Sequence, residues 1–145
     1  MDKIPILIIN GPNLHKLGSR ESKIYGAMTL DEIYQKIIEY AQTRNAQVKF
    51  FQSNIEGEII DQIYKSVDFF NGIILNAGAY SHTSIAIRDA ISSINIPVVE
   101  VHISNIFNRE AFRHHSYLSP VCVGTITGFG YLGYILALEY FSLSA

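Results

Sequence analysis

Short apolar runs alternate with amphipathic segments along the whole chain. The third apolar run, 72–76 (GIILN), is continuous, as is typical of a strand buried on both faces of a parallel sheet. We therefore expect five strands, at 4–9 (IPILII), 47–52 (QVKFFQ), 72–76, 97–102 (PVVEVH) and 121–126 (VCVGTI).

The segments between these runs have helical periodicity. A helix is predicted from about Thr29, because Thr29 and Glu32 match a capping box and apolar residues follow at helical spacing. Further helices are expected from about Gly57, over 81–94 and over 130–141, with a helical turn near 108–112. The last helix is almost entirely apolar and is interpreted as core or as a subunit contact rather than as a membrane element.

Strict alternation of strands and helices predicts a parallel sheet with right-handed crossovers. Five strands in 145 residues favour an α/β, flavodoxin-like three-layer sandwich with strand order 2-1-3-4-5. The length suits a single domain over 1–145.

Polar residues gather where three of the predicted strands end. These are the segments 10–13 (NGPN), 76–82 (NAGAYSH) and 100–105 (EVHISN). In an open parallel sheet, ligands bind outside the carboxyl ends of the strands, at the point where the strand order reverses. We therefore expect the three segments to line one cleft.

A polar loop, interrupted by glycines, follows the first strand and is predicted to be a lid over about 17–26. Gly18 and Gly26 are candidate hinges, and Arg20 and Tyr25 lie between them. The alternative is that Tyr25 merely packs the loop and that Arg20 is a surface charge.

The strand-end residues offer acid–base chemistry. Glu100 and His102 are two apart on a strand, so their side chains leave the same face, and a carboxylate beside an imidazole favours its protonated form. His102 is thus a candidate general acid. The alternative is a solvated strand end.

Tyr25 is a candidate base if Arg20 stabilises its phenolate and so lowers its pKa.

Other polar groups near the strand ends could bind an anion. The backbone amides of Ile103 and Ser104 could form a nest for a carboxylate, and Arg113 could reach a hydroxyl or an anion. A base and an acid without an obvious nucleophile indicate proton abstraction next to a carbonyl, or an elimination.

Composition narrows the class of protein. Hydrophobic residues make up 48% and charged residues 17% of the chain, which is more apolar surface than one core needs, so a homo-oligomer is expected. A net charge of -2 without a basic run argues against nucleic acid. One cysteine, Cys122, excludes an internal disulfide and fits the cytoplasm. Neither a signal peptide nor a membrane span is evident, so a soluble, unprocessed protein is expected.

Two other motifs are interpreted as structural. Residues 128–133 (GFGYLG) match the dinucleotide-binding pattern GxGxxG, but the chain ends too soon afterwards for a strand carrying the ribose-binding acid. These glycines are expected to allow close packing of the last helix. His114 and His115 are adjacent and would diverge on a helix, so metal binding is not expected.

Four segments in order along the chain closely resemble type II 3-dehydroquinate dehydratase. They are GPNLHKLGSRESKIYG, NAGAYSHTSIAIRDAI, EVHISNIFNREAFRHHSYLSP and GTITGFGYLGY. The resemblance implies a hydro-lyase of the shikimate pathway, which feeds aromatic amino acid biosynthesis. Its reaction is the trans-elimination of water from 3-dehydroquinate, through an enolate, to give 3-dehydroshikimate. It also implies no metal or organic cofactor and a cytoplasmic dodecamer built as a tetramer of trimers.

The resemblance also implies roles for individual residues. Tyr25 would remove a C2 hydrogen, Arg20 would assist it, Asn13 would help to hold the enolate, and His102 would protonate the departing C1 hydroxyl. Glu100 would support His102. The positions that match substrate-binding residues are Asn76, His82, Asp89, Ile103, Ser104 and Arg113, and Asp89 would come from a neighbouring subunit.

The lid departs from the family pattern. His15 and Lys16 replace the usual Asn-Leu, and Ser22 replaces the usual Pro. These changes bear on substrate affinity and lid motion, whereas Asn13, Arg20, Tyr25 and His102 are all present.

Alternatives remain at the level of the sequence. An imine route would need a lysine in the cleft, for which only Lys16 and Lys23 in the lid are candidates. The same reaction could serve quinate breakdown. A flavin carrier or receiver domain, or a catalytically silent relative acting through its oligomeric surface, would share the fold. However, Asn stands after strands 1 and 3 where a receiver needs acidic residues.

Overall fold

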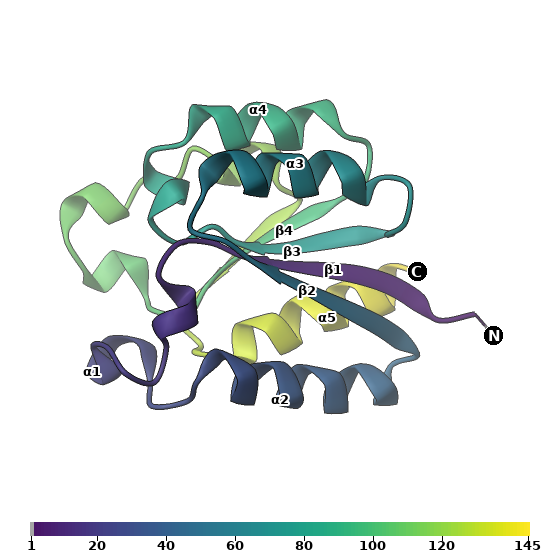
Figure 1. Cartoon of the computed structure of the whole chain (residues 1–145), viewed down its shortest axis with the longest axis horizontal. Coiled ribbons are helices and arrows are strands. Elements are labelled where there is room, and N and C mark those ends of the chain that lie inside the picture. The colour runs from purple at the N-terminus through teal and green to yellow at the C-terminus, as the bar shows by residue number, and fades with distance from the viewer. Residues whose placement is uncertain (1) are drawn as a thin grey trace.

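The computed structural model describes residues 2–145 and contains one five-stranded parallel sheet (Figure 1). Its order is β2-β1-β3-β4-β5, as predicted. The strands are β1 (Ile4–Asn10), β2 (Ala46–Gln52), β3 (Gly72–Asn76), β4 (Val98–His102) and β5 (Gly124–Thr127). Met1, which the predicted domain included, lies outside the described residues.

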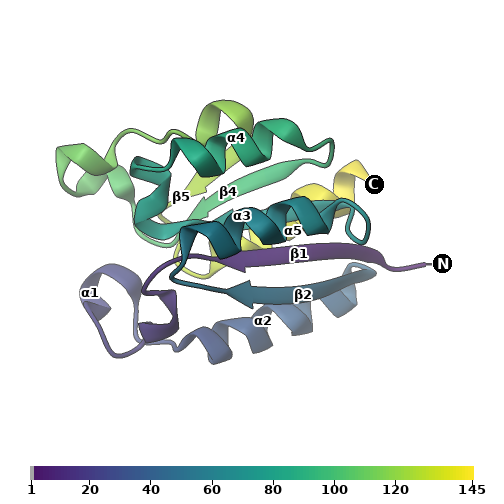
Figure 2. The ribbon, with the colours of Figure 1, turned by 45° about the horizontal axis from the view of Figure 1, so that its top comes forward.

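Helices cover both faces of the sheet, which makes the predicted three layers (Figures 1 and 2). Helices α2 and α5 lie on one face, and α3 and α4 lie on the other. A short helix, α1, lies apart from both layers beyond the carboxyl ends of the strands. The helices are α1 (Ser22–Tyr25), α2 (Leu30–Thr43), α3 (Glu56–Ser66), α4 (Ile85–Ser93) and α5 (Leu132–Ser144).

The core consists of two apolar clusters separated by the sheet. Alternate side chains of β1 belong to opposite clusters: Ile6 and Ile8 pack toward α2 and α5, and Leu7 and Ile9 pack toward α3 and α4. All four side chains are buried. Central strands buried on both faces explain why their sequences are continuously apolar, and the sheet therefore forms a rigid base for its carboxyl-end loops.

The predicted capping box at the start of α2 is confirmed. The Thr29 hydroxyl oxygen accepts a hydrogen bond from the Glu32 amide at 3.2 Å, and the Glu32 carboxylate accepts one from the Thr29 amide at 3.4 Å. The cap fixes where the lid segment ends and the helix begins.

The prediction of a single helix over 81–94 was wrong at its start. Residues Gly78–His82 form a 3₁₀ turn, and α4 begins only at Ile85. Ser84 explains the break, because its hydroxyl oxygen accepts a hydrogen bond from the Ile87 amide at 2.9 Å and so caps α4.

The last strand also begins later than the predicted 121–126. Residues Ser119–Val121 form a 3₁₀ turn with Pro120 in its first turn. The Cys122 amide then donates to the carbonyls of Leu118 and Ser119, and pairing with β4 starts only at Gly124. Cys122 therefore lies in a turn rather than in the strand, since its amide is already used locally.

Two of the glycines of 128–133, Gly128 and Gly133, allow close packing, as expected, whereas Gly130 has open space around it and a positive φ. A Cβ atom on Gly133 would lie 3.1 Å from the Val101 side chain, so the start of α5 sits close against β4. The Gly130 amide donates to the Ile103 carbonyl at 3.0 Å and ties this turn to the end of β4. Among residues 2–145, no helix combines the length and apolarity that a membrane crossing requires.

Candidate active site

A cleft lies at the carboxyl ends of β1, β3 and β4, where the sequence predicted it. It brings together the lid, the Gly78–His82 turn and the segment after β4. Of the predicted site residues, those lining the cleft are Asn13, Arg20, Tyr25, Asn76, His82, His102, Ile103, Ser104 and Arg113.

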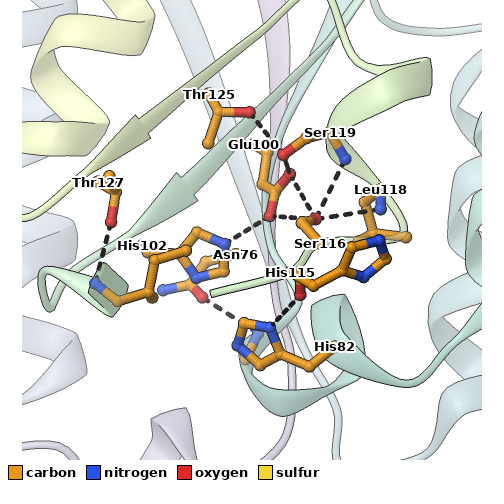
Figure 3. A network of polar contacts seen from close by, with 12 residues as sticks. Asn76, His82, Glu100, His102, His115, Ser116, Leu118, Ser119, Thr125 and Thr127 are labelled. Carbon is orange, nitrogen blue, oxygen red and sulfur yellow. Dashed lines mark hydrogen bonds and ion pairs between the residues drawn. The ribbon is translucent and has the colours of Figure 1, made fainter. Parts of the chain in front are cut away.

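His102 and Glu100 form the predicted pair at the end of β4. The His102 Nε2 lies 2.5 Å from Glu100 Oε2, and both side chains are buried (Figure 3). A carboxylate only accepts hydrogen bonds when ionised, so Nε2 carries a proton that it donates to Glu100. The solvated strand end considered for this segment was therefore wrong.

Two serines complete the surroundings of Glu100. Ser116 donates to the carboxylate at 2.9 Å, and Ser119 donates to Oε1 at 2.6 Å (Figure 3). Burial by itself would raise the pKa of the Glu100 carboxyl, but the hydrogen bonds from His102, Ser119 and Ser116 outweigh it and lower the pKa. Sequence reasoning missed both serines, because they lie in an irregular segment whose path it did not predict.

His82 lies beside His102 with a fixed tautomer. Its Nδ1 is 2.8 Å from the His115 carbonyl oxygen, which only accepts, so Nδ1 carries the proton (Figure 3). The His82 and His102 rings stack with centroids 5.8 Å apart. Partial burial lowers the pKa of His82 more than its bond to the His115 carbonyl raises it, which favours a neutral ring.

Tyr25, the candidate base, is held by an arginine that the sequence analysis did not single out. Arg109 Nη1 donates to the Tyr25 hydroxyl at 2.8 Å and lies 3.3 Å from the Ser104 hydroxyl. Arg20 stacks over the Tyr25 ring at 4.8 Å while pairing with Glu21. The feature of the sequence that could have indicated Arg109 is its position in the polar segment that follows β4.

Asn76 is part of a buried polar chain beneath the cleft. Its amide nitrogen donates to the Tyr134 hydroxyl at 2.9 Å, and its oxygen accepts from the Gly78 amide at 3.1 Å. Tyr134 in turn donates to Asn10 at 2.5 Å. Burial raises the pKa of Tyr134 more than its bond to Asn76 lowers it, so this phenol stays neutral. The chain fixes the orientation of Asn76.

Two predicted residues do not line the cleft of this chain. Glu100 is buried and contacts the cleft only through His102, to which it is hydrogen-bonded. Asp89 is exposed on α4 and is not among the residues around the cleft. A role for Asp89 in a neighbouring site therefore stays a prediction.

The cleft is suited to proton transfer. No lysine is among the residues that line it, and within residues 2–145 no three His, Cys, Asp or Glu side chains gather as a metal site would require. A phenol bound by a guanidinium and an imidazole bound by a carboxylate face the same cavity. Fold and cleft together define an acid–base enzyme on a flavodoxin-like scaffold.

The family follows from comparison with known proteins. The family described as dehydroquinase class II matches residues 4–142 of this chain. The chain belongs to this family.

Individual relatives cover nearly the full length. The chain is 52% identical over 137 residues to "3-dehydroquinate dehydratase 2" of Pseudomonas aeruginosa, covering 94% of this chain and 93% of the relative. It is also 52% identical to a Nitratiruptor protein named 3-dehydroquinate dehydratase, covering 92% and 85%. A solved type II dehydroquinase from Butyrivibrio crossotus superimposes with a TM-score of 0.93 at 48% identity, covering 95% and 97%.

Proposed function

We propose that this protein is a 3-dehydroquinate dehydratase, which removes water from 3-dehydroquinate to give 3-dehydroshikimate. This reaction is the third step of the shikimate pathway, toward chorismate and the aromatic amino acids. The observation that carries the proposal is that Tyr25 bound by Arg109 and His102 bound by Glu100 line one cleft in a chain of this family.

The first step is removal of a C2 hydrogen by the Tyr25 phenolate. Arg109 donates a hydrogen bond to the hydroxyl that must become anionic, and Arg20 places a second positive charge over the ring. Positive charges attract a phenolate, and exclusion of water strengthens that attraction. Closure of the lid over 17–26 would exclude that water.

The electrons of the broken C–H bond move onto the C3 carbonyl oxygen and form an enolate. Such an oxyanion needs donors aimed at it in advance. Asn13 lines the cleft at the end of β1, and its backbone is held by a hydrogen bond from its amide to the Asn54 side chain at 3.0 Å. This placement supports its proposed role in holding the enolate, through a water molecule.

In the second step the enolate collapses and the C1 hydroxyl leaves as water. His102 supplies the proton, since Glu100 holds its Nε2 and leaves Nδ1 for the cleft. The imidazole recovers its proton from solvent, and Tyr25 returns the C2 proton to solvent. The proposed elimination is trans, with base and acid acting on opposite faces of the ring.

The remaining cleft residues are proposed to bind the substrate. The backbone amides of Ile103 and Ser104 suit its carboxylate, while Arg113, His82 and Asn76 suit its hydroxyls. Neutral His82, with its proton on Nδ1, has Nε2 as a hydrogen-bond acceptor.

We further propose a cytoplasmic homo-oligomer, a dodecamer built as a tetramer of trimers. Among residues 2–145, thirteen large hydrophobic side chains are exposed on the single chain, including Phe69, Phe112 and Leu143. Asp89 is proposed to reach the active site of a neighbouring subunit in the trimer.

The proposal is tested by adding 3-dehydroquinate and following the ultraviolet absorbance of the conjugated enone product. We expect turnover by the native protein and loss of at least about 100-fold in kcat for Tyr25→Phe, since the base is removed. Tyr140→Phe, at an exposed position on α5, is the matched control and should retain activity. Unchanged turnover by Tyr25→Phe would contradict the assignment of the base. Borohydride reduces an imine between a lysine and the substrate to a stable covalent adduct. Inactivation by borohydride in the presence of substrate would therefore contradict the enolate route.

A further inference from the structure

The segment 115–119 contacts His82 directly and His102 through Glu100. The His115 carbonyl accepts from His82 Nδ1, and the Ser116 and Ser119 hydroxyls bind Glu100, which binds His102 (Figure 3). Both serines are half-buried, and Glu100 is fully buried. The serine hydroxyls do not line the cleft, so any effect they have on chemistry passes through Glu100.

The direction of the Ser116 hydrogen bonds follows from its neighbours. The amides of Leu118 and Ser119 both donate to the Ser116 oxygen at 3.1 Å. The two amides use the lone pairs of the Ser116 oxygen. Its hydrogen is therefore free to be donated to the Glu100 carboxylate, whose oxygens lie 2.9 and 3.0 Å from the Ser116 oxygen. The turn thus makes Ser116 a donor to Glu100.

Ser119 is constrained in the same way. A hydroxyl has one hydrogen, and that of Ser119 goes to Glu100 Oε1 at 2.6 Å. In the contact of 2.9 Å between Ser119 and Thr125, Thr125 must therefore be the donor. Ser116 and Ser119 thus both point their hydrogens toward the carboxylate, an arrangement that favours its ionised form.

We propose that Ser116 and Ser119 are positioning residues that keep Glu100 ionised and aimed at His102 Nε2, so that the imidazole can hold the proton it gives to the leaving hydroxyl. This inference rests on the proposed dehydratase function. Without the serines, only His102 would offset the desolvation of the buried carboxylate, and a proton shared by the pair would sit more often on the carboxyl group. In that state His102 is neutral and lacks its counter-ion.

Within residues 2–145, three other charged or titratable groups lie around Glu100 and His102 and could affect their protonation. His82 stacks on His102, Arg113 lies near His82, and Cys122 lies near Glu100. Burial raises the pKa of the Cys122 thiol to about 12, so it stays neutral over the range of the test. The neutral His82 and the thiol cannot replace the serines as donors fixed on Glu100.

The test compares Ser116→Ala, Ser119→Ala and the double variant with the native protein. We expect kcat to fall about tenfold for each single variant, as loss of a hydrogen bond to a charged group implies, with KM changed less than about threefold. The alkaline limb of the pH–rate profile should move to lower pH, because His102 loses its proton more readily beside a protonated Glu100. Ser119→Thr, which keeps the hydroxyl, should restore most of the rate.

A second measurement does not depend on turnover. Titration of His102 by ¹⁵N NMR without substrate should show its imidazolium losing a proton at lower pH in each alanine variant and unchanged titration in Ser144→Ala, an exposed control. If the native protein proved inactive on 3-dehydroquinate, this titration would still decide the role of the serines. A His102 titration and an alkaline limb that match the native protein in both single variants would overturn the proposal.

Discussion

At the scale of residues, the candidate active site contains two hydrogen-bonded pairs, in each of which one side chain fixes the position of the other. Tyr25 is held by Arg109, and His102 is held by Glu100. The sequence suggested the second pair because period-two spacing on a strand places side chains on one face. It could not suggest the first, because Tyr25 and Arg109 are 84 residues apart and both lie outside the sheet, where no periodicity fixes side-chain direction.

Arg109 should matter for rate more than for binding. We expect Arg109→Ala to lower kcat about tenfold to hundredfold, because a hydrogen bond to the reacting phenolate is lost. Arg44→Ala is a matched control, since both guanidinium groups lie 5.1 Å from a tyrosine ring, but Arg44 pairs with Tyr40 and Glu139 away from the cleft. Steady-state kinetics would measure both. Equal, small effects for the two variants would count against the role of Arg109.

At the scale of elements, most of the fold was predictable from sequence and most of the corrections share one cause. Strands β1 and β3 were predicted well because burial on both faces leaves continuous apolar runs. The starts of α4 and β5 were misplaced because Ser84 and Pro120 favour local turns, and these compete with the regular hydrogen bonding that periodicity assumes. Ser119 lies in the turn before β5, and Arg109 and Ser116 lie in the irregular segment after β4, where no periodicity predicts side-chain direction.

Two buried or partly buried titratable groups, Glu100 and His82, should make the protein sensitive to acid. The pKa of Glu100 and that of His82 are both lowered in the fold, so in each case the unfolded chain binds protons more readily. As pH falls below the ordinary histidine pKa of about 6.5, and again below that of glutamate at about 4.3, stability is lost. We expect the Tm from calorimetry to decrease from about pH 7 to pH 5 through His82, and again from about pH 4.3 to pH 3 through Glu100. A constant Tm over both ranges would contradict these shifts.

At the scale of the whole molecule, the single chain presents an active-site cleft and many exposed hydrophobic side chains. Phe69, Phe112 and Leu143 are each exposed by at least 67%. The amino-acid composition predicted this excess, but sequence periodicity could not indicate which faces would carry it.

Assembly and catalysis should be coupled through Asp89. If Asp89 enters a neighbouring cleft, Asp89→Ala should raise KM at least about fivefold while sedimentation velocity shows an unchanged oligomer. Asp61→Ala, a substitution of another aspartate on a helix of the same face, should alter neither quantity. A monomeric native protein at assay concentration would refute the shared site. So would a KM for Asp89→Ala that equals the native value.

In the proposed mechanism of the whole enzyme, Tyr25 takes a hydrogen from one face of the substrate while His102 protonates the hydroxyl that leaves from the other face. Dehydration of 3-dehydroquinate carrying deuterium at C2 on one face or the other measures this directly, by mass spectrometry of the product. We predict that the deuterium trans to the C1 hydroxyl is lost and that the cis deuterium is retained. Loss of the cis deuterium, or loss from both faces, would contradict the account.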